Sequence, residues 1–143
     1  MTLWSIANAP LQLGDDLTLL DKFGVQLLTN DEVIAVDQSG SPGSVVIEGT
    51  TPVWAQTLCD GSYYVALFNL NDSSSPVTVS WTSLGFSGAA SVRDLWARNE
   101  VGSVSGGYSV SLNAHGSALL RVSPESGGRA RDNRGHCEVP GPR

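Results

Sequence analysis

The sequence predicts a mainly β protein: an antiparallel β-sandwich of about eight strands, Greek-key type, preceded by a short α-β-α piece. Three observations carry this prediction. From residue 45 onward, apolar and polar residues alternate with a period of two, as in half-buried strands. Asp60-Gly61 separates two such runs and is a strong hairpin signal. Before residue 40 the period is helical on either side of one short apolar run, the order found at the end of a (β/α)8 barrel.

The first forty residues predict a helix, a strand and a second helical region. One helical face is formed by Leu3, Trp4, Ile6 and Ala7. A helix is expected over residues 4–9, because Pro10 lacks the amide donor that would continue it. Residues 11–14 have the length and apolar character of a short barrel strand. Asp21 and Asn30 have the side chains of N-caps, so helical structure is expected over residues 21–37.

Eight strands are expected in the remainder of the chain. Their ranges are 45–48, 53–58, 63–70, 77–84, 91–97, 102–105, 108–113 and 117–122. Val77, Val79 and Trp81 alternate with hydroxyl residues, which predicts one buried and one wet face. Residues 63–68 are apolar on both faces and predict a central strand. Asp60-Gly61 predicts a type I′ turn, with positive φ at both residues.

Composition narrows the classes of partner. The chain has 143 residues and a net charge of −6, from 14 acidic and 8 basic side chains. A nucleic-acid partner is therefore not expected, because phosphate binding needs clustered Lys and Arg. No apolar run reaches the roughly 18 residues that span a bilayer, so no membrane partner is expected either. No signal-peptide pattern is present.

The pattern changes again near the end of the chain. Residues 125–143 are rich in Gly, Arg and Pro and carry 4 basic and 3 acidic side chains, whereas residues 1–124 carry 4 and 11. We expect a barrel remnant at 1–40, a sandwich at 45–123 and a disordered tail at 124–143. Two cysteines, Cys59 and Cys137, are too few for a disulfide framework. Whether these two pair with each other stays open.

Several segments resemble the C-terminal part of glycoside hydrolase family 27, the α-galactosidase (melibiase) family. They are LWSIANAPLQLGDDL, LLTNDEVIAVDQ, VWAQTLCDGSYYVALFN, VSWTSLGFSG, SVRDLWA and HGSALLRV. The resemblance runs from Thr2 to Val122, and residues 125–143 match nothing in the family. It implies that residues 2–9 correspond to the seventh barrel helix and residues 11–14 to the eighth strand. Residues 21–37 would be the last helical region.

The resemblance also implies a chemistry that these residues lack. Family members hydrolyse a terminal α-linked galactose with retention, using an Asp nucleophile and an Asp acid/base about 5 Å apart. In the family these residues follow the fourth and sixth barrel strands, which would lie before Met1. A barrel needs roughly 250 residues, far more than the forty barrel-like residues here. We therefore expect an inactive scaffold fragment, with no catalytic, cofactor-binding or metal residues and no cofactor. The α-galactoside would be a ligand of the full-length parent alone. The resemblance favours a secreted parent, since family members are often exported or lysosomal, and the compartment of this chain stays open.

The side chains that could carry chemistry all have a simpler interpretation. Asp15 and Asp16 follow the expected eighth strand, but adjacent residues point to opposite sides, so capping is favoured over catalysis. Turn or surface roles are favoured for Asp37, Asp60, Asp72, Asp94 and His115. His136 and Cys137 are two ligands, where zinc normally takes four. Core packing is favoured over a sugar-stacking platform for Trp4, Trp54, Trp81 and Trp96.

Two alternatives accompany the scaffold hypothesis. The first is a stand-alone carbohydrate-binding or structural β-sandwich without catalysis, which needs at least two exposed aromatic side chains on one face, with Trp54 the residue to test. The second concerns stability. Without a barrel, the apolar face at Leu3, Trp4, Ile6 and Ala7 would lose its partners. In that case residues 45–122 fold, while residues 1–37 pack poorly or self-associate through the barrel-facing surface.

Overall fold

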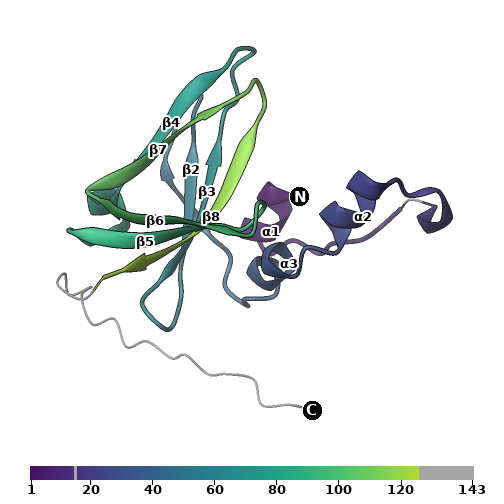
Figure 1. The fold of residues 1–143 in the computed structure, drawn as a ribbon, viewed down its shortest axis with the longest axis horizontal. Coiled ribbons are helices and arrows are strands. Elements are labelled where there is room, and N and C mark those ends of the chain that lie inside the picture. Colours follow the sequence, from purple (N-terminus) through teal and green to yellow (C-terminus); the bar gives the residue numbers. More distant parts are fainter. Residues whose placement is uncertain (15, 126–143) are drawn as a thin grey trace.

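The computed structural model describes residues 1–14 and 16–125 and places a β-sandwich beside three short α-helices (Figure 1). The helical elements are α1 (Thr2–Ile6), η1 (Leu17–Leu19), α2 (Lys22–Leu28), α3 (Asp31–Asp37) and η2 (Trp81–Leu84), where η marks a 3-10 turn. The strands are β1 (Ser44–Ile47), β2 (Val53–Thr57), β3 (Tyr63–Phe68), β4 (Ser75–Ser80), β5 (Ala89–Asp94), β6 (Asn99–Ser105), β7 (Gly107–Leu112) and β8 (Ser117–Pro124). The predicted mainly β, antiparallel class is confirmed.

Two antiparallel sheets form the sandwich. The larger has the strand order β1-β2-β3-β8-β5-β6, and the smaller pairs β4 with β7. The chain enters the smaller sheet at β4 and again at β7, and it returns to the larger sheet at β5 and at β8. β3 and β8 are neighbours in the middle of the larger sheet, paired from Tyr63 opposite Val122 to Phe68 opposite Ser117. The prediction of a central strand at residues 63–68 is confirmed.

The main core lies between the two sheets. Val77 and Val79 of β4 point into it and are fully buried, while the hydroxyl groups of Thr78 and Ser109 meet on the outer face at 2.8 Å. The predicted alternation of β4 and β7 is therefore confirmed. The ring of Phe86 stacks between Tyr63 and Trp81, with ring centroids 5.4 and 5.5 Å away. Stacked rings of this kind add to the free energy gained from burial alone.

A second, smaller cluster lies on the opposite face of the larger sheet. Ala66 and Leu119 are paired across β3 and β8 and point toward the helices rather than the main core. They contact the fully buried side chains of Ile6 from α1 and of Val33 and Val36 from α3. In Figure 1, α1 and α3 lie side by side next to this sheet, while α2 extends away from it.

This packing corrects the expectation that residues 1–37 as a whole pack poorly. α1 and α3 have a buried face on the sandwich, because the sheet itself supplies apolar partners for Ile6 and Val33. By contrast, none of the described residues from 9 to 29 is buried. The expectation therefore holds for the segment that includes η1 and α2, and fails for the two helices that flank it.

Backbone and amide hydrogen bonds fix α1 against its neighbours. Asn8 adopts a φ of 50° just after the helix, and its side-chain amide donates to the carbonyl of Val36 at 2.8 Å. The amide of Gly43 donates to the carbonyl of Ile6 at 2.7 Å. A Cβ at Gly43 would lie 2.9 Å from Ile6 Cγ1, so only glycine allows this approach.

Four local predictions are wrong. The helix expected over residues 4–9 spans Thr2–Ile6, because Asn8 leaves the helical region before Pro10. Residues 11–14 form no strand, since a strand needs hydrogen-bonded neighbours and none of the described strands pairs with them. At Asp60-Gly61 only Gly61 has positive φ, 82°; Gly61 donates to the carbonyl of Leu58, the pattern of a longer turn with a glycine bulge.

The fourth wrong prediction is a strand that continues through Trp81. β4 ends at Ser80, whose hydroxyl caps η2 by accepting from the amide of Ser83. Gly85, with a φ of 90°, ends the 3-10 turn. The indole of Trp81 is nevertheless fully buried, and its Nε1 donates to the carbonyl of Val104 at 2.9 Å. The other strands agree in order, and β8 reaches Pro124, one residue beyond the expected sandwich.

Candidate functional site

Most acidic side chains of the helical segment have structural roles. Asp16 caps η1 by accepting from the amide and hydroxyl of Thr18 at 2.9 and 2.6 Å, and these hydrogen bonds lower the pKa of its carboxyl. Asp21 caps α2 by accepting from the amide of Gly24 at 2.7 Å. The capping interpretation is confirmed for Asp16, and Asp15 lies outside the described residues.

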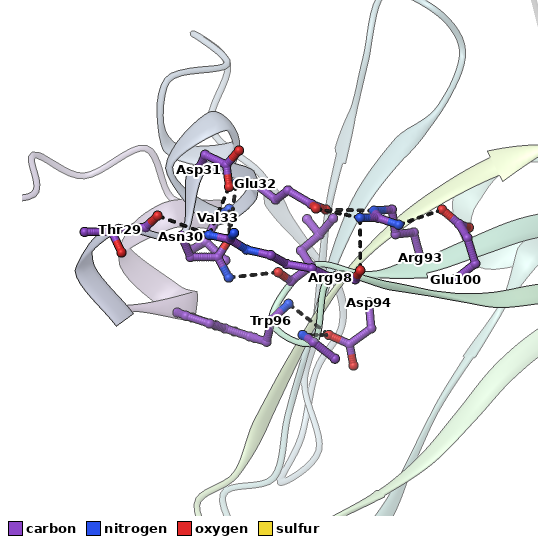
Figure 2. A network of polar contacts seen from close by, with 12 residues as sticks. Thr29, Asn30, Asp31, Glu32, Val33, Arg93, Asp94, Trp96, Arg98 and Glu100 are labelled. Atoms are coloured by element: carbon purple, nitrogen blue, oxygen red, sulfur yellow. Dashed lines mark hydrogen bonds and ion pairs between the residues drawn. The ribbon is translucent and has the colours of Figure 1, made fainter. Parts of the chain in front are cut away.

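An ion-pair network joins the start of α3 to the β5–β6 hairpin (Figure 2). The Arg93 guanidinium of β5 donates to both carboxylate oxygens of Glu32, at 2.8 and 2.6 Å, and to Glu100 at 2.9 Å. This bidentate contact holds the pKa of Glu32 below its usual value and raises that of Arg93. The side chains of Arg93 and Glu32 are about one third and one quarter exposed, so solvent screens the pair only in part.

Asn30 and Arg98 complete the same network from the other side. Asn30 is buried and caps α3 by accepting from the amides of Glu32 and Val33, while its Nδ2 donates to the carbonyl of Leu95 at 2.9 Å. Arg98, with a φ of 53°, reaches Asp31 at 3.0 Å and the carbonyl of Thr29 at 3.1 Å (Figure 2). Together these contacts fix α3 to the sandwich and position the last residue of the helix, Asp37.

Asp37 is the acidic side chain of α3 that takes no part in this network. It lines an open cleft of about 410 Å³, together with Trp4, Leu13, Leu28 and Ile34. Its Oδ1 is buried and has no hydrogen-bond partner among the described residues. Burial raises the pKa of this carboxyl, because desolvation disfavours the charged form. Asp37 is half-buried at the end of α3, and the turn or surface role expected from the sequence stays a prediction.

Seven large apolar side chains of residues 1–28 are exposed, and two of them, Trp4 and Leu13, line this cleft. We call this set the uncovered apolar surface: Leu3, Trp4, Leu13, Leu17, Leu19, Phe23 and Val25. Phe23 and Leu19 are 68% and 80% exposed, values unusual for large apolar residues that belong to a structured element. The core-packing prediction is wrong for Trp4, which is 53% exposed, because the helical face that carries it points away from the sheet.

The other tryptophans do pack. Trp81 belongs to the main core, and Trp54 and Trp96 pack partly buried against the second cluster. Trp96 also donates from Nε1 to the hydroxyl of Thr2 at 2.9 Å, which ties α1 to the β5–β6 hairpin. None of the large apolar side chains fully exposed on the described strands is aromatic.

The remaining candidates occupy turns, as predicted. Asp60 accepts from Ser62 and pairs with Arg121 at 2.6 Å. Burial acts to raise the pKa of the Asp60 carboxyl, but the contacts with Ser62 and Arg121 outweigh it and lower that pKa. Asp94 accepts from the backbone amides of the turn after β5. Asp72 and His115, two exposed side chains, meet at 3.0 Å.

Of the two cysteines, Cys59 lies in the β2–β3 turn and is not a free thiol. Cys137 and His136 lie outside the described residues, as do residues 126–143 of the tail expected at 124–143. Within the described ranges, no three His, Cys, Asp or Glu side chains cluster as metal ligands. No helix in those ranges is long and apolar enough to cross a bilayer.

These features define a class of protein: an antiparallel β-sandwich that carries a helical segment with exposed apolar side chains. Residues 48–122 match the family model of the alpha-galactosidase C-terminal β-sandwich domain, and the chain belongs to this family. The part of the chain before residue 48 therefore contains the uncovered apolar surface and the Asp37 cleft, outside the matched range.

Relatives extend the similarity to most of the chain. The α-galactosidase of Coffea arabica is 38% identical over 129 residues, which cover 87% of this chain and 34% of the coffee protein. A family 27 β-L-arabinopyranosidase from Geobacillus stearothermophilus has a TM-score of 0.83 at 37% identity, covering 88% of this chain and 29% of that one. α-Galactosidase I of Mortierella vinacea has a TM-score of 0.80 at 30% identity, covering 85% and 33%. The chain thus spans about a third of the length of the curated relatives it matches.

Proposed function

We propose that this chain is the C-terminal scaffold of an α-galactosidase-like retaining glycoside hydrolase, and that it is inactive by itself. The parent would hydrolyse terminal α-D-galactosyl residues in carbohydrate metabolism. The observation that carries this proposal is the match of residues 48–122 to the α-galactosidase C-terminal β-sandwich domain, together with a 129-residue match to about a third of the coffee α-galactosidase. The catalytic domain would occupy the remaining two thirds.

The structural roles of most described carboxylates support the proposal that this chain lacks catalytic residues. A retaining mechanism needs two carboxyl groups about 5 Å apart in one substrate pocket. In the described residues Asp16 and Asp21 are helix caps, while Glu32, Asp60 and Asp72 have ion-pair partners. Asp37 alone lines a cleft, with no second carboxylate in its lining. The cleft therefore offers no acid/nucleophile pair.

The uncovered apolar surface supports a role in contact with a catalytic domain. Covering an apolar side chain such as Phe23 or Leu19 gains roughly 1.5–3 kcal/mol. In the isolated chain nothing among the described residues covers these side chains, so we expect association between copies that increases with concentration. Light scattering after size exclusion measures this, with Phe23→Ser expected to shift the chain toward monomer and Val101→Ser, on a strand of the sandwich, expected to leave it unchanged.

The direct test of the proposal has two arms. In the first, the purified 143-residue chain is incubated with p-nitrophenyl α-D-galactopyranoside between pH 4 and 8, and no release above a heat-treated blank is expected. In the second, residues 1–125 replace the matching segment of the coffee α-galactosidase, and the chimera is expected to hydrolyse the same substrate. Turnover by the isolated chain, or an inactive chimera beside an active coffee enzyme, would contradict the proposal.

A further inference from the structure

The helical segment, residues 1–38, is strongly acidic. Asp37 is the described carboxylate of this segment that neither caps a helix nor forms an ion pair. Residues 1–38 carry six acidic side chains and one basic side chain. Of the five acidic residues described there, two are helix caps, and Asp31 and Glu32 form ion pairs with Arg98 and Arg93. Asp37 is the fifth, and its Oδ1 is buried without a hydrogen-bond partner among the described residues.

Three features of its position are unfavourable for an unpaired carboxylate. Its Oδ1 is buried, which removes the water that would solvate this oxygen. It is the last residue of α3, where the helix dipole is negative and favours cations. Its open cleft is lined by apolar side chains such as Trp4 and Ile34 and by the amides of Gln12 and Gln38, and no Lys, Arg or His is part of that lining. Other sites on the surface of α3 would avoid all three, so the position indicates a missing partner.

The geometry points to a cation as that partner. We propose that Asp37 forms an ion pair with an Arg or Lys side chain of the catalytic domain when that domain covers the uncovered apolar surface. This inference depends on the proposed function, because the catalytic domain is the occupant it names. The cleft, open and about 410 Å³ in volume, has room for one long side chain to reach the carboxylate.

Charge complementarity favours a cation over a neutral donor. A neutral hydrogen-bond donor would satisfy Oδ1, but it would leave the charge of Asp37 uncompensated beside a helix segment with five further acidic residues. An Arg or Lys satisfies both the oxygen and the charge. The two cases differ in their response to Asp37→Asn, since the amide keeps the acceptor oxygen and loses only the charge.

The experiment compares Asp37→Asn in two settings, the isolated chain and the chimera with the coffee catalytic domain. In the isolated chain, removing an unpaired buried charge is expected to raise Tm by about 3–5 °C. In the chimera the same change removes one member of an ion pair and is expected to lower Tm by about 3 °C or more. Asp72→Asn is the matched control, because its side chain is 98% exposed in the loop between β3 and β4; it should shift neither value by more than about 1 °C.

Asp37→Lys provides a second, independent readout. In the isolated chain this variant should keep the wild-type near-ultraviolet circular dichroism, because a long side chain at the helix end can reach solvent. In the chimera it places a cation against a cation, and we expect at least a tenfold loss of activity that survives heating. The reversed charge thus tests the sign of the missing partner.

The outcomes separate the two proposals. If the wild-type chimera is active and Asp37→Asn raises Tm in both settings, or changes it in neither, the ion pair is refuted while the proposed function stands. The same holds if Asp37→Lys leaves the chimera unaffected. If the wild-type chimera is inactive, both proposals fail together. Opposite shifts in the two settings, with an unchanged Asp72→Asn control, support the ion pair.

Discussion

Replacing Ile6 by alanine tests whether α1 is part of the folded sandwich domain in this chain. Ile6 is fully buried in the second cluster, between α3 and the central strands. The change removes three buried carbon atoms, worth about 2.4 kcal/mol at 0.8 kcal/mol each, and leaves a cavity that raises the cost to about 3 kcal/mol. For a domain of this size, about 3 kcal/mol corresponds to a Tm lower by roughly 10 °C.

Urea unfolding followed by tryptophan fluorescence measures this cost. Leu19→Ala is the matched control, because that side chain is 80% exposed and its loss should change the unfolding free energy by less than about 0.5 kcal/mol. An Ile6→Ala protein whose unfolding free energy is within about 0.5 kcal/mol of wild type would refute the reasoning. It would mean that α1 is not docked, as the sequence alone had led us to expect for residues 1–37.

Three further predictions concern the ion-pair network and the sheet. Asn30→Ala should cost about 2 kcal/mol in urea unfolding, because it removes the cap of α3 and leaves a buried carbonyl unpaired. Since the pKa of Glu32 is lowered in the folded state, its contribution to stability is present above its ordinary pKa of 4.5 and is lost as pH falls through the lower folded value. Thermal unfolding from pH 7 to 3 should therefore show wild type converging on Glu32→Gln at acidic pH, and parallel curves would contradict this. Gly107→Ala should cost more than about 2 kcal/mol by the same urea assay, because its Cβ would lie 2.5 Å from the Val79 carbonyl, whereas Gly14→Ala meets nothing within 4 Å and should be neutral.

Local chemistry made much of the fold predictable. Asp21 and Asn30 cap helices as expected, because an Asp or Asn side chain satisfies the first free amides wherever the chain enters a helix. Val77 and Val79 face the core because a strand with one wet face must alternate. These predictions depend only on residues a few positions apart, so a single sequence is enough to make them.

The errors arise where the outcome depends on distant partners. Residues 11–14 have the pattern of a strand but no neighbouring strand to pair with in the described chain. Trp4 shares the helical face predicted to be buried, yet of that face only Ile6 is buried against the sheet.

The candidate site was missed for the same reason. Nothing in the sequence joins Arg93 to Glu32, which lie 61 residues apart. The local signal for Asp37 was an acidic residue at the end of an apolar helix, the end where the dipole disfavours it.

β3 and β8 separate the two apolar clusters: Val65 and Leu120 face the main core, and Ala66 and Leu119 face the second cluster. The family match begins at residue 48, whereas the covering of the second side comes from α1 and α3, which precede it. A boundary drawn by sequence similarity is therefore not a boundary of folding. A shortened protein that starts at residue 48 would expose Ala66 and Leu119 to water. Residues 1–37, which resemble the end of a barrel in sequence, therefore also cover the outer face of the sandwich.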